Sequence, residues 1–497
     1  MNNFQSLRLF IPELIILGTI LVAIIADLFY SKDKSYKVGY WVLTGLLLAM
    51  AVLWLTDKTE VTTLFLNSIA LDPFSRIFKF IFILATLFVI IMSMRTSELQ
   101  KVRTGEYFVL LAVVVLGMFL MASSIDLIMV YLSIEVVSIA SFILAGYLKT
   151  EVRSNEASLK YVIYGAFSSG IMLYGLSLLF GLTGTTKLFE ISEAIARLNG
   201  EGNLTLIVAT IFIMAGFGYK ISAVPFHFWT PDVYEGAPTP ITAFLSVAPK
   251  AAGFALLIRF FNSLFGTGAV FEPGTWQSLE GIPWQQVIAV VAAITMTLGN
   301  LVAIQQSNIK RLLAYSSIAH AGYILMGIPV LSQDGIHAMI FYIIVYLFMQ
   351  LGAFFVAILI SNKFGTEEIA EYSGIGFKSP LLGVLMALFM FSLTGIPPTA
   401  GFIGKFYLFA ALINGGPQFY WLAVWGVLNS VVSLYYYMRI VKVMFFEGQS
   451  ELELYIPSAL PTTLLMVFGI PTLLFGVYWS PIADWVQNSL MFFVSKM

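Results

Sequence analysis

The sequence predicts an all-α polytopic membrane protein with about fourteen transmembrane helices, and three observations lead to this prediction. Hydrophobic residues make up 59% of the 497 residues, charged residues make up 11%, and the mean hydropathy is +0.91. A soluble domain carries about 25% charged residues, because water must wet its surface. Apolar runs of roughly 20 residues, the length that crosses a bilayer, recur along the whole chain. We therefore expect a lipid bilayer to be the solvent of this protein.

The composition also excludes several classes of function. A formal net charge of −1 indicates no basic stripe, which argues against a nucleic-acid partner. The absence of cysteine excludes disulfides, thiolate-ligated iron–sulfur clusters and zinc ribbons. Only three histidines are present, which does not favour a histidine-rich metal site or several haems: His227, His320 and His337. We expect a protein without a redox centre of its own.

The apolar runs define the predicted spans. No long polar stretch separates them, so we expect no soluble domain. The first run is too long for a cleaved signal peptide and lacks a small-residue cleavage site, which predicts a retained helix. The spans are expected at 9–30, 38–56, 77–95, 107–123, 127–148, 156–182, 204–224, 238–261, 284–304, 312–330, 337–360, 380–412, 420–446 and 459–480.

Basic residues in the loops predict the orientation, because cytoplasmic loops carry an excess of Lys and Arg. The alternate loops hold fewer basic residues, chiefly Lys58, Arg76, Lys187 and Arg197. Both termini are therefore expected on the outer side of the membrane. The segments after the first, third, fifth, ninth, eleventh and thirteenth spans hold Lys32, Lys34, Lys37, Arg95, Lys101, Arg103, Lys149, Arg153, Lys310, Arg311, Lys363, Lys378, Arg439 and Lys442.

Two of the predicted spans are interrupted by proline. One break lies in GFGYKISAVPFHFWTPDVYEGAPTP at 216–240, and the other lies in SLTGIPPTAGFIGKF at 392–406. Proline removes a helical hydrogen bond, and in lipid the freed groups need protein or a watery cavity around them. Lys220 and Lys405 stand about 185 positions apart, each beside its break, and paired broken helices indicate inverted repeats around an ion path. Two ordinary proline kinks are the alternative interpretation.

Three charged residues fall far inside predicted spans. Lys250 follows Pro238 by a helical rise of roughly 18 Å, near the bilayer centre. Glu135 is roughly 12 Å from the nearer end of its span, and Lys405 lies in the second half of its broken helix. A charge at mid-membrane costs at least ~2.5–3.5 kcal/mol, so such residues are expected to be functional. A purely structural buried ion pair is the alternative for Lys250 and Glu135.

Lys160 and His320 are weaker candidates. Lys160 is near the predicted start of its helix, where a lysine can extend to the headgroups. His320 could be an ordinary core histidine, but Ser316 and Tyr323 share its helix face and can form hydrogen bonds. A lysine that is alternately paired with and parted from a carboxylate takes up and releases a proton. This set of residues suits protons better than sodium, because sodium needs a cage of oxygen ligands.

Four segments resemble the antiporter-like membrane subunits of respiratory complex I (the type I NADH–quinone oxidoreductase) and the related Mrp antiporters. The resemblance implies fourteen helices with two inverted five-helix repeats, each with a discontinuous helix. It places an N-terminal three-helix segment at 1–106, the repeats at 107–261 and 284–446, and a C-terminal helix with an amphipathic tail at 447–497. The segments are MVYLSIEVVSIASFILAGY, GYKISAVPFHFWTPDVYEGAPTPITAFLSVAPKAAGFALLIR, NIKRLLAYSSIAHAGYILMG and LTGIPPTAGFIGKFYLF.

Within this family the chain looks like the N-type subunit. M-type chains carry a glutamate where this chain has Lys405, and L-type chains continue into a long lateral helix, whereas about seventeen residues follow the last predicted span here. By resemblance, Glu135 and Lys220 form an ion pair where protons enter, and Lys250 is the connecting lysine. His320 is then the relay, Lys405 serves the second half-channel, and Lys160 is the basic neighbour of the glutamate.

The resemblance implies proton translocation that is driven at a distance by a quinone-reducing complex. Flavin, iron–sulfur clusters and quinone are then expected in partner subunits and no cofactor in this one. Expected partners are other membrane subunits, including further antiporter-like ones, and the lipid bilayer. The tail at 481–497 and the loop at 183–203 either contact neighbours or lie at the membrane interface.

A bacterial inner membrane is the expected location, and an organellar or thylakoid membrane is compatible with the same sequence. An Mrp-type cation/proton antiporter is the alternative function. A membrane subunit of a hydrogenase-like complex, or a passive scaffold, is a third possibility.

Overall fold

A computed structural model describes residues 3–56, 61–100, 102–197, 202–265, 284–330, 332–448 and 455–490. The chain forms two compact units, which are described separately below. The first unit lies within residues 1–222, 248–284 and 488–497, and the second within 223–247 and 285–487. One helix, α12 (Thr239–Phe265), begins in the second unit and continues into the first.

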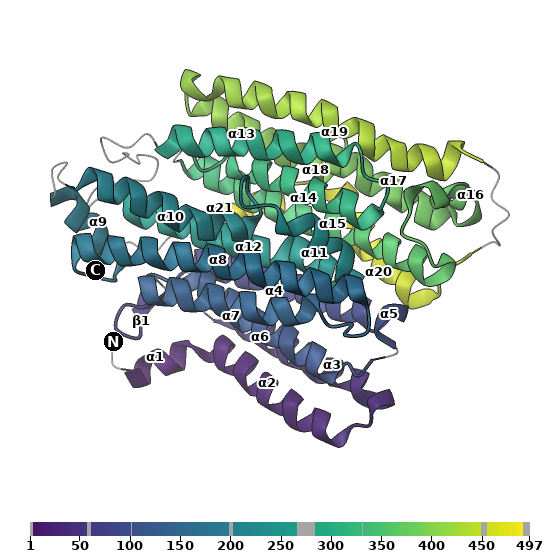
Figure 1. The fold of residues 1–497 in the computed structure, drawn as a ribbon, viewed down its shortest axis with the longest axis horizontal. Coiled ribbons are helices and arrows are strands. Elements are labelled where there is room, and N and C mark those ends of the chain that lie inside the picture. The colour runs from purple at the N-terminus through teal and green to yellow at the C-terminus, as the bar shows by residue number, and fades with distance from the viewer. Residues whose placement is uncertain are drawn as a thin grey trace. The chain divides into compact units, whose positions relative to one another are not determined.

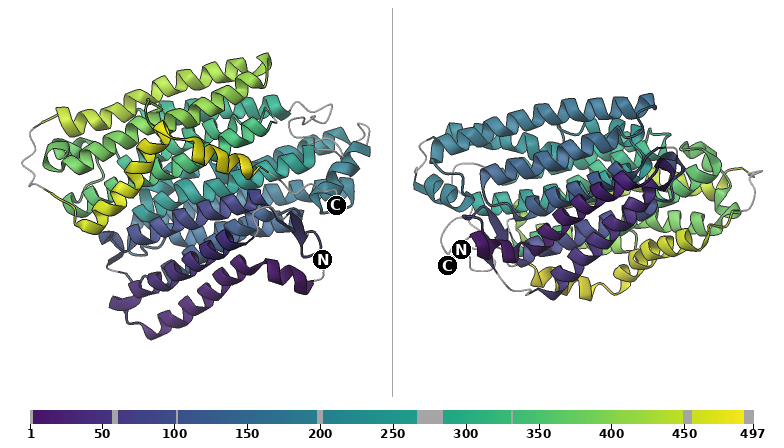
Figure 2. Two further views of the ribbon diagram at one scale, coloured as in Figure 1. Left: turned by 180° about the vertical axis from the view of Figure 1, so that it is seen from behind. Right: turned by 90° about the horizontal axis from the view of Figure 1, so that it is seen from below.

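The first unit is a bundle of long helices with one short hairpin (Figures 1 and 2). Neighbouring helices of this unit pack in pairs, including α2 with α3, α4 with α6, α6 with α7, α7 with α8 and α8 with α10. Its elements are α1 (Asn3–Leu9), α2 (Ile11–Phe29), η1 (Lys32–Lys37), α3 (Val38–Leu55), β1 (Thr62–Leu64), β2 (Ile69–Leu71), α4 (Pro73–Ser93), α5 (Ser97–Gln100), α6 (Gly105–Ser123), α7 (Leu127–Ala145), α8 (Val152–Thr183), α9 (Leu188–Arg197) and α10 (Asn203–Ile221).

Two aspartates cap helices of the first unit and also form ion pairs. Asp72 caps α4 through a capping box with Ser75, and its carboxylate makes two hydrogen bonds of 2.8 and 2.9 Å with the Arg259 guanidinium. Burial alone would raise the pKa of Asp72, but the charge and hydrogen bonds of Arg259 outweigh it and hold the pKa below its ordinary value. Asp126 caps α7 and pairs with Lys187 at 2.8 Å.

The second unit is organised around α15, which is buried on every side over residues 335–360. A helix that is apolar all round belongs in a core, and α15 contacts α14, α17, α18 and α20. The elements of this unit are α11 (Trp229–Gly236), α13 (Trp284–Ala303), α14 (Ile309–Leu325), α15 (Gln333–Phe364), η2 (Ile369–Tyr372), α16 (Ile375–Lys378), α17 (Pro380–Thr394), α18 (Ala400–Asn414), η3 (Pro417–Phe419), α19 (Tyr420–Phe446), α20 (Ala459–Val477) and α21 (Ser480–Asn488).

Both predicted helix breaks are present. Helix α10 ends at Ile221, and the next helix, α11, begins at Trp229. The span expected at 380–412 consists of α17 and α18, which are separated by residues 395–399. Gly395 adopts a left-handed conformation (φ 89°) at the end of α17, as is common where a helix stops.

Many outward helix faces are apolar, as expected of a protein surrounded by lipid. On α2, for example, Leu21 is 55% exposed and Leu28 is 75% exposed. Among the described residues, twelve helices are long and apolar enough to cross a membrane. The shorter helices α17 and α18 share one predicted span, and α14 has 17 residues. The polytopic all-α fold is confirmed, while the exact number of fourteen spans is not.

The predicted segment boundaries at 106, 261, 284 and 446, and the inverted relation of the two repeats, stay predictions. The tail expected at 481–497 is helical as far as Asn488, in α21. Its residues 491–497, and residues 198–201 of the predicted polar loop, lie outside the described residues.

Candidate functional site: ionisable groups inside the helices

Glu135 lies in the middle of α7 and is half-buried. Its carboxylate accepts a hydrogen bond from the hydroxyl of Ser169 on α8. A carboxylate inside a spanning helix needs such partners, because lipid supplies none. The Ser169 hydroxyl therefore provides polar surroundings for this charge.

Lys220 lies one residue before the end of α10, and its side chain is buried. The ammonium donates a 3.1 Å hydrogen bond to the hydroxyl of Ser138 on α7. Ser138 follows Glu135 by three residues, so their side chains are neighbours on one helix face. Glu135 therefore acts electrostatically on Lys220, although the two form no direct ion pair. The structure thus places the Lys220 ammonium on a serine one helical turn from Glu135, and the functional role of the two residues stays a prediction.

Lys250 is buried on α12, one turn before Gly253. Gly253 permits close packing of α12 on α10. A Cβ atom at this position would lie 2.8 Å from Cγ2 of Ile221 and 3.2 Å from Cγ of Lys220. Pro249 stands inside α12 directly before Lys250 and removes one helical hydrogen bond. The first unit thus places the helical segment that carries Lys250 against the one that carries Lys220.

Lys160 lies apart from this group. Helix α8 begins at Val152, earlier than the predicted 156, and Lys160 pairs with Glu156 at 2.7 Å on its partly exposed surface. Nine residues separate Lys160 from Ser169, which corresponds to the opposite helix face and a rise of roughly 13.5 Å. The structure therefore does not bring Lys160 to Glu135, and its assignment stays a prediction.

In the second unit, His320 is buried among tyrosines. The two ring nitrogens of His320 lie 2.7 Å from the Tyr342 hydroxyl and 3.0 Å from the Tyr437 hydroxyl. Ser316, one turn earlier on α14, shares a 2.5 Å hydrogen bond with the same Tyr437 hydroxyl. The imidazole therefore has a hydroxyl at each nitrogen, an arrangement that permits proton transfer in either direction.

Lys405 is buried on α18 beside the second helix break. Its ammonium donates hydrogen bonds of 2.8 Å to the Thr394 carbonyl and 3.0 Å to the Ser430 hydroxyl. It also lies 4.3 Å from the centre of the Tyr323 ring. The last carbonyls of a helix carry a partial negative charge, so the end of α17 stabilises this cation. The break thus supplies a partner for the lysine.

A chain of hydrogen bonds continues from Lys405. The Ser430 hydroxyl donates to the Tyr323 hydroxyl at 3.1 Å, and the rings of Tyr323 and His320 are 5.9 Å apart between centroids. Near the same residues, the Tyr436 hydroxyl donates to the Asn300 amide oxygen at 2.9 Å. Lys405 and His320 thus lie in one polar region of the second unit, and Tyr323 lies between them.

Sequence reasoning missed most of the partners of these groups. Ser138, Ser169 and Ser430 stand in apolar runs, but serine is common in spanning helices and gave no distinct signal. A buried ion pair in the first unit was also missed. Lys79 on α4 lies 2.5 Å from Glu13 on α2, and both side chains are 3% exposed. The predicted span began at 77, which made Lys79 an end residue, whereas α4 begins at Pro73.

Among the described residues, no group of three His, Asp or Glu side chains could hold a metal ion. The spanning helices instead hold ionisable side chains, of which Glu135, Lys220, His320 and Lys405 are hydrogen-bonded to neutral side chains or to a helix end. These features define a polytopic membrane protein with ionisable groups inside its helices and two helices broken beside a lysine.

The chain belongs to the NADH:quinone oxidoreductase/Mrp antiporter family, whose sequence profile matches residues 124–433. It is 47% identical over 487 residues to NADH-quinone oxidoreductase subunit N 2 of Chloroherpeton thalassium, covering 97% of this chain and 94% of that protein. It is 42% identical over 487 residues to NAD(P)H-quinone oxidoreductase subunit 2 of Gloeobacter violaceus, covering 96% of this chain and 91% of that protein. The predicted family is confirmed.

Solved structures show the same fold. A chain of respiratory complex I from Thermus thermophilus matches with a TM-score of 0.77 and 28% identity, covering 95% of this chain and 98% of that one. A chain of the Mrp complex from Dietzia sp. matches with a TM-score of 0.80 and 22% identity, covering 96% of each chain. At 22% identity, the similarity to the Mrp chain shows a common fold and nothing more.

Proposed function

We propose that this chain is the N-type, proton-translocating membrane subunit of an NADH–quinone oxidoreductase or of a related quinone-reducing complex. The relatives of 44–47% identity are subunits N of NADH-quinone oxidoreductases, which supports the assignment to subunit N. The observation that carries the mechanism is the set of buried lysines inside apolar helices, led by Lys220, Lys250 and Lys405. A protein that only fills the membrane has no need of these charges, because each is costly to insert.

In this proposal the first half-channel uses Glu135, Lys220 and Lys250, and the second uses His320 and Lys405. The Glu135 carboxylate binds a proton or stabilises the neighbouring ammonium of Lys220, depending on which of the two is charged. His320 accepts a proton at one ring nitrogen and releases one from the other to a tyrosine hydroxyl. Lys160 acts as a basic neighbour at the edge of the first half-channel.

The proposal also covers the cofactors, the partner subunits and the membrane location of this chain. The subunit carries no redox centre, and flavin, iron–sulfur clusters and quinone are held by partner subunits. Its partners are other membrane subunits, including further antiporter-like ones. It lies in a bacterial cell membrane with both termini on the outer side, as the loop charges predict.

The test is proton pumping by the intact complex in proteoliposomes. Glu135→Ala and Lys220→Ala should each remove most of the proton uptake and slow quinone reduction, while the complex stays assembled. Arg197→Ala is the matched control, because Arg197 lies in an exposed ion pair with Glu193 and should leave pumping unchanged. Wild-type proton stoichiometry in both test variants would refute the relay.

An Mrp-type antiporter is the competing function, because its fold matches equally well. Co-purification distinguishes the two functions. The proposed subunit should be isolated with flavin- and iron–sulfur-containing proteins and should support quinone reduction. An antiporter subunit should instead be isolated without them and should exchange sodium for protons.

A further inference from the structure

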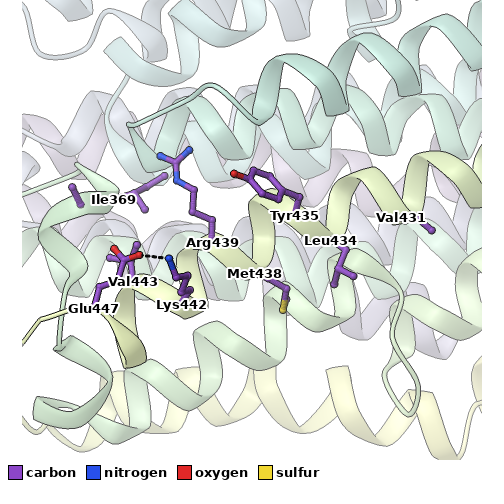
Figure 3. Close-up of a pocket in the computed structure, with 10 residues that line it drawn as sticks. Ile369, Val431, Leu434, Tyr435, Met438, Arg439, Lys442, Val443 and Glu447 are labelled. Atoms are coloured by element: carbon purple, nitrogen blue, oxygen red, sulfur yellow. Dashed lines mark ion pairs between the residues drawn. The ribbon is translucent and has the colours of Figure 1, made fainter.

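A groove of about 680 Å³ runs along one face of α19 in the second unit (Figure 3). Five of its residues recur at helical spacing, and η2 contributes Ile369 and Ala370. Val431 is 64% exposed and Tyr435 is 63% exposed, so this apolar floor is open. Seven lining residues lie on α19, and the five at this spacing are Val431, Leu434, Tyr435, Met438 and Lys442.

The groove becomes basic toward the C-terminal end of α19. The half-buried Arg439 guanidinium donates 3.0 Å hydrogen bonds to two carbonyls, those of Ile304 and Gln306. Among the described residues, no carboxylate forms an ion pair with Arg439. Lys442 pairs with Glu447 at 2.7 Å, and Figure 3 shows this pair at the same end. Two carbonyls stabilise the Arg439 guanidinium, but no carboxylate of the described residues neutralises its charge, which favours an anionic occupant.

The dimensions of the groove match one leaflet of a bilayer. Val431 and Val443 are separated by a helical rise of roughly 18 Å. This is slightly more than half of the ~30 Å hydrocarbon core. A groove of this length fits a lipid in one leaflet, because its floor is apolar from Val431 to Met438 and basic beyond, at Arg439 and Lys442.

We propose that this groove binds an anionic phospholipid. Its acyl chains lie along Val431, Leu434 and Met438, and its phosphate binds Arg439 and Lys442. The loop charges predict that this end of α19 is cytoplasmic, the side on which anionic lipids attract basic residues. A neighbouring subunit is the competing occupant. The lipid site is independent of the proton relay, so either proposal can fail without the other.

The first experiment measures phosphatidylglycerol that is retained by the intact complex after titration in detergent. Arg439→Gln should lower the apparent affinity about fivefold, the contribution of one basic residue near a membrane surface. Met438→Trp should also lower phosphatidylglycerol binding, because the indole fills the groove without changing the charge. Lys34→Gln is the matched control, because Lys34 is an exposed basic residue of η1 in the first unit. Unchanged binding in both groove variants would overturn the proposal.

The second experiment identifies what covers the groove. A photoreactive group is attached to Met438→Cys in the intact complex, which is held in bilayers containing phosphatidylglycerol. Crosslinks to phosphatidylglycerol are expected, and they should be lost when Arg439→Gln is added. Crosslinks mainly to another subunit would show that a protein occupies the groove and would refute the lipid site.

Discussion

The Lys405 ammonium lies 2.8 Å from the carbonyl oxygen of Thr394, the last residue of α17. The lysine belongs to α18, so the second helix break brings a cation to the end of the preceding helix. A helix C-terminus carries about half a negative charge, and this stabilises the ammonium without a carboxylate. An ammonium that is held by a helix end can lose its proton, and no unpaired carboxylate is then left in the membrane.

Lys405→Gln should separate the structural role of this side chain from its proton-transfer role. Glutamine keeps a neutral N–H donor near the break but has no proton to exchange at neutral pH. We expect the complex to assemble, and proton transfer through the second half-channel to slow by about 100-fold. Native gels report assembly, and acidification of proteoliposomes reports proton transfer. Loss of assembly with unchanged pumping in the remaining complex would indicate a structural lysine.

Ser430 tests the hydrogen-bond chain between Lys405 and Tyr323. Ser430→Ala removes the hydroxyl that joins them and should slow pumping by about 10- to 150-fold, since a hydrogen bond to a charged group contributes about 1.5–3 kcal/mol. Ser430→Thr should restore the rate, because it restores the hydroxyl. Ser433→Ala is the control, because the hydroxyl of this buried serine on the same helix donates to the backbone carbonyl of Ser430. Equal rates in Ser430→Ala and Ser433→Ala would contradict the chain.

The breaks and the buried lysines could be predicted from the sequence because they are visible along the chain. Proline and glycine interrupt apolar runs near Lys220 and Lys405, and a charge such as Lys250 in a long apolar run stands out. The hydroxyl partners could not be predicted. Ser430 and Tyr437 are ordinary residues of an apolar helix, and only the packing of α19 near α14 and α18 makes them neighbours of His320 and Lys405.

Errors in the predicted starts of helices explain where other charged residues differ from the prediction. Hydropathy places a helix start only within a few residues, because the first turn often contains polar or proline residues. Helix α4 begins four residues before the predicted span, at its Asp72 cap. Lys79 therefore lies in the membrane-spanning helix and pairs with Glu13, rather than at an interface. Lys160, by contrast, lies on a partly exposed face, which hydropathy alone does not distinguish from a buried one.

Gly253 is predicted to set the separation of α12 and α10. Gly253→Ala places a Cβ 2.8 Å from a methyl group of Ile221, and such overpacking costs about 1–3 kcal/mol. The unfolding temperature should fall, and pumping should fall with it because Lys220 is displaced. Gly170→Ala on α8 is the control, because nothing lies within 4 Å of its new Cβ. There the helix should be stabilised by about 0.5–1 kcal/mol. Equal changes in unfolding temperature and pumping for Gly253→Ala and Gly170→Ala would contradict a role of Gly253 in the packing of α12 on α10.

The Asp72–Arg259 pair predicts a reversal in the pH dependence of stability. In the wild type the pKa of Asp72 is lowered despite burial, because of Arg259. The pair therefore stabilises the fold above the unfolded pKa of about 3.9, and this contribution is lost as the pH falls through the lower folded value. Arg259→Gln leaves a buried carboxylate without its cation and should cost about 3–5 kcal/mol near pH 7.

In the Arg259→Gln variant, burial instead favours protonated Asp72, which raises its pKa above the unfolded value. The deficit in unfolding temperature relative to the wild type should therefore shrink as the pH is lowered from about 7.5 to 5, where wild-type Asp72 stays ionised. Arg197→Gln is the control, because Arg197 pairs with Glu193 at 3.5 Å and the two side chains are 81% and 64% exposed. An exposed pair contributes at most about 1 kcal/mol, so that variant should show a small deficit. A deficit for Arg259→Gln that stays constant over this pH range would mean that Asp72 retains its charge by another interaction.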